Sequence, residues 1–333
     1  MRYRQTGLKS IILFLILIFL VFHLACRSDQ KKVKVIKLGH GLDPSHPVHM
    51  AMEFLAERVA KKSNERMRID VYPSEQLGSE RECLELLQIG SLAMTKVSCS
   101  VIEGFVPEMS ILSLPYLFRD EAHRFRVLEG EIGRELLLAG ENYWLRGLCY
   151  YDAGTRSFYT VDRPILSPED LSGLKIRTQE SPTSMRMVQA LGGSATPIAW
   201  GELYSALQQG VVDGAENNPP SFHLSRHYEV CKYYSLDEHT GVPDILVIST
   251  KIWEDLLPDF QRILQEAANE SELHQRELWK QATQTALKEV QKAGVAIYHP
   301  VKTPFILRVK AIYDEYKSQP RIYDIIQRIR EVK

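Results

Sequence analysis

The chain has 333 residues, 44% of them hydrophobic and 25% charged. This is an ordinary composition for a soluble globular protein and is enough for two domains with cores of their own. The 41 basic and 42 acidic residues give a formal net charge of -1, which argues against a general surface for nucleic acid or other polyanions. Selectivity for a charged ligand therefore has to be local.

The N-terminus carries the pattern of an export signal. Three basic residues precede the apolar run IILFLILIFLVF at residues 11–22. This run is too short to span a bilayer but is typical of a signal-peptide core. We expect the signal peptide to occupy residues 1–26, with residues 27–32 as a polar tether.

The end of this segment, HLAC, is similar to a bacterial lipoprotein cleavage site, in which Cys26 becomes the lipidated first residue of the mature chain. His23 stands where such sites usually carry Leu or another aliphatic residue. Cleavage at a small residue and retention as an uncleaved anchor are the alternatives. All three place the folded part outside the cytoplasm, and the favoured one predicts a periplasmic protein anchored to a membrane as a lipoprotein.

The other four cysteines are widely spaced, lie in apolar segments and follow no CxxC or metal-ligand pattern. An even number in an exported protein permits disulfides. Free cysteine also behaves as a small buried hydrophobe, and we favour this interpretation for Cys83, Cys99, Cys149 and Cys231.

Strands and helices alternate after the tether. Period-two and helical apolar patterns predict a strand, a helix, a strand, a helix ending at Gly90 and a strand over residues 33–40, 43–63, 66–73, 80–90 and 91–98. The first helix carries Val48, Met52, Leu55 and Val59 on one stripe. Such βαβ units imply a parallel sheet covered by helices.

A second run of the same kind begins near residue 147. It predicts a strand at 174–178, a helix capped by Ser181 and stopped at Gly192, an extended segment at 194–200, a short helix at 201–210 and a strand at 211–218. Two α/β lobes follow from these two runs.

The pattern from residue 258 to about 294 is helical almost without a break. A continuous helix of this length is about 50 Å long, which is longer than one lobe is wide, so we expect it to brace both lobes. The expected lobes are discontinuous, with approximate boundaries at 33–153 plus 243–282 for lobe I and 154–242 plus 283–333 for lobe II.

Common enzyme signatures are absent from the sequence: there is no GxSxG, P-loop, HExxH, or GxGxxG after a strand. His46 and His49 could share a helical face as a metal pair. No third ligand is evident, and histidines near a helix start are more often caps or surface residues. We therefore predict no metal and no cofactor.

Arg177 is the most informative charged residue. It ends an apolar strand shortly before the helix start at Ser181, and the carboxyl ends of strands in open α/β sheets border ligand crevices. A guanidinium beside a helix N-terminus suits a carboxylate. Position alone also fits an ordinary surface arginine.

Seven segments together resemble one family: PSHPVH, VYPSEQLGSERE, LPYLFRD, AGTRSFYT, SPEDLSGLKIR, ELYSALQQGVVDGAEN and the EH after HYEVCKYYSLD. In this order they are similar to the substrate-binding proteins of tripartite ATP-independent periplasmic (TRAP) transporters, the DctP-like family, over nearly all of the mature chain. The resemblance implies a two-lobe Venus flytrap fold that captures an organic acid. It delivers the acid to a small and a large membrane subunit driven by an ion gradient, and it is not an enzyme.

The resemblance also implies ligand-binding residues. The arginine of GLKIR, Arg177, matches one that holds the ligand carboxylate through two bonds. Arg156 matches a second arginine that often faces the ligand, and Asn217 matches an asparagine that bonds it. Trp200 stands at an aromatic or apolar wall, and His239 matches a histidine of a polar network behind the cleft.

Departures from the family pattern bear on the ligand. Ser98 stands where sialic-acid-binding members have a glutamate, and Glu180 where they have an asparagine, so sialic acid is disfavoured. The segments GAENN, RHYEV, KYYSLDEH and PDILVIS are most similar to members that take hexuronates and related sugar acids. We rank sugar acids first, C4-dicarboxylates second and apolar carboxylates third.

Closure of the cleft is expected to bring lobe I residues onto the ligand, around His40 to His46 and Ser98 to Ser100. Two alternatives stay open on the same shell: a ligand sensor, for which no output domain is evident, and a lyase, for which Glu180 is the one candidate base. The sequence does not indicate an oligomeric state.

Overall fold

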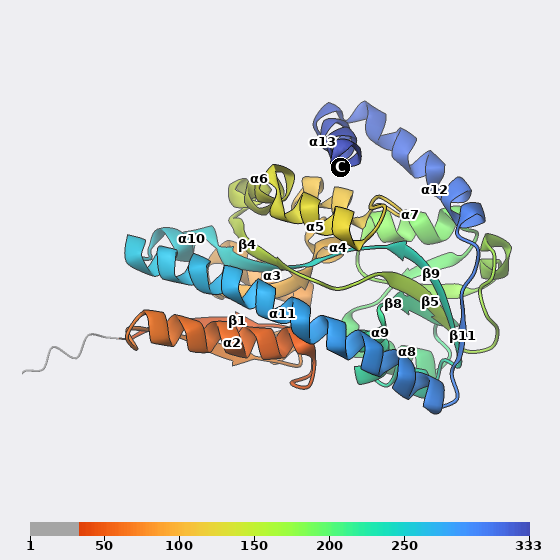
Figure 1. Cartoon of the computed structure of the whole chain (residues 1–333), viewed down its shortest axis with the longest axis horizontal. Helices are drawn as coiled ribbons and strands as arrows, with labels where there is room; N and C mark the ends of the chain where they lie inside the picture. The colour runs from red at the N-terminus through yellow and green to blue at the C-terminus, as the bar shows by residue number, and fades with distance from the viewer. Residues whose placement is uncertain (1–32) are drawn as a thin grey trace, which may run out of the picture. The chain divides into compact units, whose positions relative to one another are not determined.

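The computed structural model describes residues 33–333, which are built around two mixed β-sheets with helices packed on them (Figure 1). The predicted signal peptide, Cys26 and the tether at 27–32 lie outside the described residues. Within residues 33–333, no helix is both long enough and apolar enough to cross a membrane.

The first sheet has the strand order β2-β1-β3-β10-β4. Its strands are β1 (Lys34–Gly39), β2 (Met67–Tyr72), β3 (Met94–Ser98), β4 (Leu145–Tyr151) and β10 (Asp244–Ser249). β1 pairs with β3 in parallel, as the βαβ pattern predicts. β10 is antiparallel to both β3 and β4, so the sheet also contains antiparallel pairs that the βαβ pattern does not predict.

The second sheet has the order β11-β9-β5-β8-β6-β7 and is also mixed. Its strands are β5 (Arg156–Thr160), β6 (Lys175–Thr178), β7 (Ser194–Pro197), β8 (Gly214–Asn217), β9 (Tyr233–Thr240) and β11 (Ala296–Tyr298). The predicted βαβ strands β6, β7 and β8 are parallel to one another, whereas β5 is antiparallel to β8 and β9.

The chain passes between the two sheets at residues 152–155, from β4 to β5, and at residues 241–243, from β9 to β10. The first crossing is held by side chains far along the sequence. Gln275 exchanges two hydrogen bonds of 2.8 Å with the backbone N–H and C=O of Asp152, and Arg124 donates to the Asp152 carboxylate at 2.8 Å. Gly154 has φ +60 and lies against Trp279.

The helices have the expected signals at their ends. α2 (Pro47–Lys62) buries the predicted stripe Val48, Met52, Leu55 and Val59, each contributing roughly 1.5–3 kcal/mol of apolar burial. α3 (Glu80–Ile89) begins with a capping box of Ser79 and Glu82 and ends at Gly90 in the left-handed conformation, φ 81.

The remaining shorter helices are α4 (Cys99–Ile102), α5 (Glu121–Glu129), α6 (Glu131–Ala139), α7 (Pro182–Ala190), α8 (Leu203–Gln208), α9 (Pro219–Leu224), α10 (Thr250–Glu254), α12 (Thr303–Glu315) and α13 (Pro320–Glu331). The 3-10 turns are η1 (Pro107–Ser113), η2 (Glu141–Tyr143), η3 (Pro168–Leu171), η4 (Trp200–Glu202), η5 (His227–Glu229) and η6 (Tyr316–Ser318).

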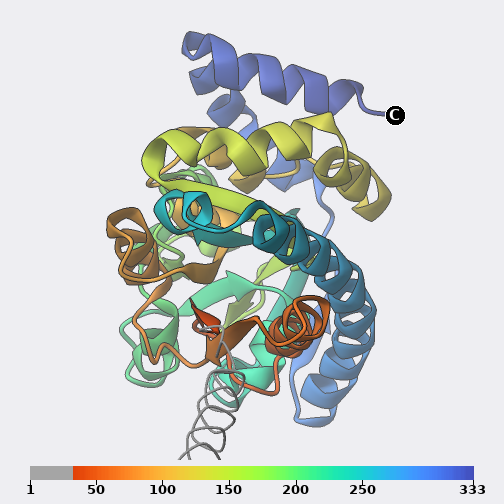
Figure 2. The ribbon, with the colours of Figure 1, turned by 90° about the vertical axis from the view of Figure 1, so that its left-hand side faces the viewer.

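The predicted long helix is present as α11 (Pro258–Lys292), 35 residues in length. It packs on α2 and β4 of the first sheet's layer and continues to α9 beside the second sheet (Figures 1 and 2). It therefore contacts both halves of the fold, as expected. After it, α12 packs on α7, and α13 packs on α6 and η1. The lobe boundaries stay a prediction.

All four cysteines of the described region are buried and free, which confirms their reading as small hydrophobic core residues. Burial raises the pKa of the Cys83 thiol to about 11 and that of Cys99 well above its usual value, so these thiols stay protonated at neutral pH.

Candidate functional site

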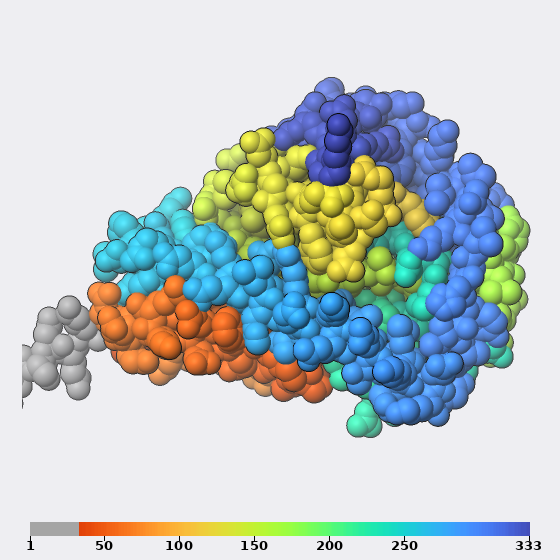
Figure 3. All heavy atoms as spheres, in the orientation of Figure 1, coloured from red at the N-terminus to blue at the C-terminus, as the bar shows by residue number. Residues whose placement is uncertain are grey.

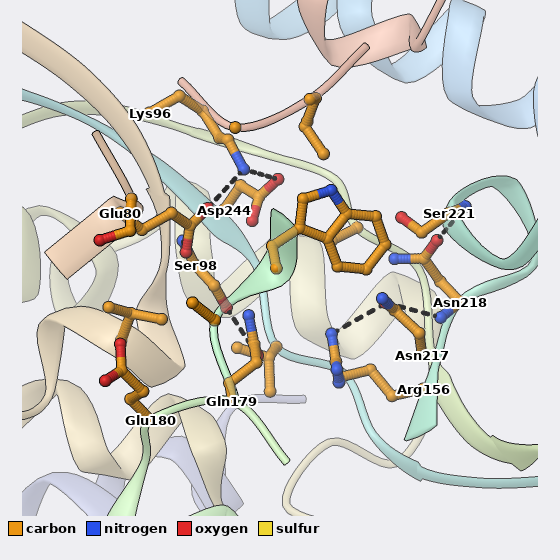
Figure 4. A pocket seen from close by; sticks show the side chains of 18 of the residues that line it. Glu80, Lys96, Ser98, Arg156, Gln179, Glu180, Asn217, Asn218, Ser221 and Asp244 are labelled. Carbon is orange, nitrogen blue, oxygen red and sulfur yellow. Dashed lines mark hydrogen bonds and ion pairs between the residues drawn. The ribbon is translucent and has the colours of Figure 1, made fainter. Parts of the chain in front are cut away.

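A cavity lies between the two sheets, at the edge where several strands end together (Figure 4). Ser98 ends β3, Asn217 ends β8, and Arg177 is the next-to-last residue of β6. Arg156 and Asp244 begin the antiparallel strands β5 and β10 at the same edge. Both sheets therefore supply charged and polar side chains to one cavity.

Arg177 is 2% exposed and has no carboxylate partner among residues 33–333. Its Nε and Nη2 donate to the carbonyl oxygen of Ile198 at 2.9 and 2.7 Å, while its buried Nη1 has no hydrogen-bond partner. Burial lowers the pKa of this guanidinium, yet arginine remains charged in proteins. An uncompensated buried cation at a cavity is a site for an anion.

Arg156 also lines the cavity, but its charge is already neutralised. Its Nε and Nη2 bond both carboxylate oxygens of Glu216, and its Nη1 donates to Asn217 Oδ1 at 2.9 Å. Burial raises the pKa of Glu216, but Arg156 and the hydrogen-bonded His239 together outweigh burial and lower this pKa to about 2. Arg156 and Glu216 therefore form a buried ion pair beside the cavity.

Asn217 presents an amide to the cavity. Its Oδ1 accepts from Arg156 and from the backbone N–H of Asn218 at 2.9 Å each. Both acceptor positions are thus used, which leaves the Nδ2 protons as donors for a ligand. Asn218 caps α9 by accepting from Ser221 N at 2.9 Å.

Trp200, Glu180 and Ser98 line the cavity as well. The Trp200 ring lies 6.0 Å from the Arg177 guanidinium carbon, which keeps water from one side of that cation. Ser98 caps α4, and its hydroxyl donates to Gln179 Oε1 at 3.2 Å. Trp279 of α11 adds a second indole to the lining.

His40 and His239 do not line this cavity. His40 is buried, bonded to His49 at 3.0 Å and to the backbone N–H of Leu42 at 3.1 Å. His239 lies behind the wall, bonded to Asp237 at 2.8 Å and to Glu216 at 3.4 Å. His239 lines instead a wider cavity of about 930 Å³, seen as the hollow between α5 and α11 in Figure 3.

A charged cluster on the other wall was not predicted. Lys96 Nζ lies 2.9 Å from Glu80 Oε1 and 3.2 Å from Asp244 Oδ2, and all three residues line the cavity (Figure 4). The sequence contained an indication of this cluster. Lys96 lies in the strand MTKVS, whose residues are all buried, and lysine is almost never buried unless it is paired with an acidic residue.

The two walls touch each other directly. His46 bonds Ser221 at 3.3 Å, Gly201 N donates to Glu75 at 3.1 Å and Ser98 bonds Gln179, so that residues near the first sheet contact residues near the second. His46 also caps α2 through its Nδ1. Across the described residues, no group of three or more His, Cys, Asp and Glu side chains is placed to hold a metal ion.

Comparison with known proteins shows the family and the fold. Residues 38–319 match the bacterial extracellular solute-binding proteins of family 7, DctP. A TRAP periplasmic solute-binding protein from a Bradyrhizobium species, solved with α/β-D-galacturonate, is 39% identical with a TM-score of 0.87, covering 89% of this chain and 99% of its own.

A TRAP periplasmic solute-binding protein from Anaerococcus prevotii, solved with α/β-D-glucuronate, is 38% identical with a TM-score of 0.85, covering 90% of this chain and 98% of its own. The C4-dicarboxylate-binding periplasmic protein DctP of Rhodobacter capsulatus is 31% identical over 266 residues, which is 80% of each chain.

The chain therefore belongs to family 7 of the bacterial extracellular solute-binding proteins, and its fold is that of the TRAP periplasmic solute-binding proteins. This confirms the family and the two-lobe α/β fold expected from the sequence motifs.

Proposed function

We propose that this protein captures a sugar acid, with a hexuronate preferred, in the cavity between its sheets and delivers it to the two membrane subunits of a TRAP permease. The main support for the proposal is that Arg177 is a buried cation whose Nη1 has no hydrogen-bond partner in the described part of the chain. Its Nη1 edge is free to bond a ligand carboxylate.

Polar groups around this anchor suit the rest of a sugar acid. The Asn217 amide offers donors, and the carboxylates of Glu80 and Asp244 offer acceptors for hydroxyl groups. Indole faces of the kind supplied by Trp200 and Trp279 pack well against sugar rings and exclude water. The solved relatives with bound galacturonate and glucuronate support this ligand class.

The roles of individual residues are part of the proposal. Arg177 holds the carboxylate and Asn217 donates to the ligand. Arg156 shapes the wall through its pair with Glu216, and Trp200 covers the anchor. His239 supports the wall from behind, and His40 supports the turn after β1. Lipid attachment at Cys26 would keep the protein beside its permease in the periplasm.

A thermal-shift screen of acids and neutral sugars tests the proposal. A ligand that binds only the folded state at 100 times its dissociation constant stabilises it by about 2.7 kcal/mol, so galacturonate or glucuronate should raise the melting temperature and galactose should not. Stabilisation by neutral sugars alone would refute the proposal. Stabilisation by succinate alone would favour the C4-dicarboxylate alternative named by the Rhodobacter relative.

A further inference from the structure

The two walls of the cavity differ in how their charges are paired, and Glu180 adds a carboxylate beside β6 on the side of the second sheet. On the side of the second sheet, Arg177 is uncompensated and Arg156 is neutralised by Glu216. On the side of the first sheet, one ammonium, Lys96, stands between two carboxylates, Glu80 and Asp244. The cluster therefore has a net charge of about -1 when all three groups are ionised.

Lys96 is not free to receive a second ligand carboxylate. Two of its three donors are used by Glu80 and Asp244, and its side chain is only 3% exposed. Glu80 is held in place because its second oxygen accepts from the backbone N–H of Ser98 at 3.1 Å. The cluster is a built feature of the wall, with both carboxylates fixed by the lysine between them.

The second oxygen of Asp244, Oδ1, accepts no hydrogen bond from any residue of 33–333, although the residue lines the cavity. Carboxylate oxygens accept from hydroxyl groups, and they repel another carboxylate, most strongly where water is scarce. The first wall is therefore suited to a hydroxyl-bearing end of a ligand and unsuited to a second acidic end.

We propose that Glu80, Lys96 and Asp244 make the cavity select acids with one carboxylate and several hydroxyl groups over diacids of the same length. The inference rests on the proposed function, because it assumes that Arg177 holds the first carboxylate. In this proposal the wall opposite Arg177 distinguishes the two kinds of acid. Its carboxylates accept hydrogen bonds from the hydroxyl groups of a sugar acid and repel the second carboxylate of a diacid.

Calorimetric titration at pH 7.5 with D-galacturonate and with galactarate, which has a carboxylate at each end of the same six-carbon chain, tests this selection. The unmodified protein should bind galacturonate more tightly than galactarate by a factor of about 30 or more, which corresponds to a difference in binding free energy of about 2 kcal/mol. Asp244→Asn keeps the shape of the side chain and removes its charge. It should therefore lower the ratio of the galactarate to the galacturonate dissociation constant by about tenfold or more.

Glu80→Gln serves as a second variant in case Asp244→Asn does not fold, and it should narrow the ratio in the same direction. Asp162→Asn is the matched control, since Asp162 is exposed on the turn after β5 and lines no part of the cavity. Its ratio should stay within about twofold of the parent.

The outcomes separate the two proposals. If galacturonate binds but galactarate binds within about threefold of it, or if neither charge-removing variant changes the ratio, the selection by this cluster is refuted and the sugar-acid function stands. If neither acid, nor any other sugar acid, binds the parent, the proposed function itself fails and the inference falls with it.

Discussion

Arg177 and Arg156 differ in their charge environment, because Arg177 has no carboxylate partner in the described residues and Arg156 is paired with Glu216. Arg177→Lys keeps a charge but cannot reproduce the planar fork of a guanidinium. We expect it to weaken sugar-acid binding by about 30-fold or more, corresponding to roughly 2–5 kcal/mol, with a small change in melting temperature. Titration calorimetry and circular dichroism measure the two quantities.

Arg156 provides the contrast. Removing it as Arg156→Ala leaves Glu216 buried without its main partner, which should cost about 3–5 kcal/mol of folding stability. Exposed Arg226→Lys is the control for both positions. The assignment of Arg177 as anchor would be wrong if Arg177→Lys bound within about threefold of the parent while a folded Arg156→Lys lost all binding.

His239 is predicted to make stability depend on pH. Burial alone would lower its pKa, but the carboxylates of Asp237 and Glu216 outweigh burial and raise it to about 9. In the unfolded chain the pKa of histidine is about 6.5. Because the pKa is raised in the folded state, protonated His239 stabilises the fold. This contribution to the free energy of unfolding is fully present below about pH 6.5 and is lost as the pH rises through about 9.

The check is the free energy of unfolding between pH 6 and 9.5. The parent should lose stability across this range, and His239→Gln should flatten that part of the curve. Exposed His299→Gln is the control. An unchanged alkaline slope in His239→Gln would show that other groups carry the dependence.

At the scale of elements, the crossing between the sheets depends on Gly154. Its φ of +60 disfavours a side chain, and a Cβ there would meet Trp279 Nε1 at 3.0 Å. We expect Gly154→Ala to destabilise the fold by about 1–3 kcal/mol through backbone strain and displacement of the indole. Because Trp279 lines the cavity, ligand affinity should fall as well.

Urea unfolding and calorimetry test this pair of effects. Gly294→Ala is a matched control, since Gly294 also has positive φ, 88, but has open space around the added Cβ. It should lose stability from backbone conformation alone and keep its affinity. If both variants kept full affinity, the crossing would not be coupled to the cavity.

At the scale of the whole molecule, the predicted lipid anchor decides where the protein works. Cys26→Ser should block lipidation, and the variant should no longer fractionate with membranes as the parent does. Salt should not release the parent, because an acyl anchor is hydrophobic and not electrostatic. Mass spectrometry of the mature N-terminus is the direct measurement, and an unmodified N-terminus downstream of Cys26 in the parent would contradict the prediction.

Much of the fold was readable from the sequence because it is encoded locally. The apolar stripe of α2, the cap at Gly90, the N-cap Ser181 and the long α11 each depend on neighbouring residues. Arg177 and Asn217, which the family motifs singled out, both line the cavity. The direction of β5 and β10 was not readable, because each pairs antiparallel with a strand far away along the chain, β5 with β9 and β10 with β3.

The family and the two-lobe α/β fold could be inferred from the sequence motifs alone, and the same motifs drew attention to Arg177. Three features became visible only in the folded chain: Arg156 is neutralised by Glu216, His40 lies outside the cavity, and Lys96 joins Glu80 and Asp244 on the wall facing Arg177. The physical reason is that charge pairing and burial depend on distances between residues far apart along the chain, such as Lys96 and Asp244, and a single sequence does not specify those distances.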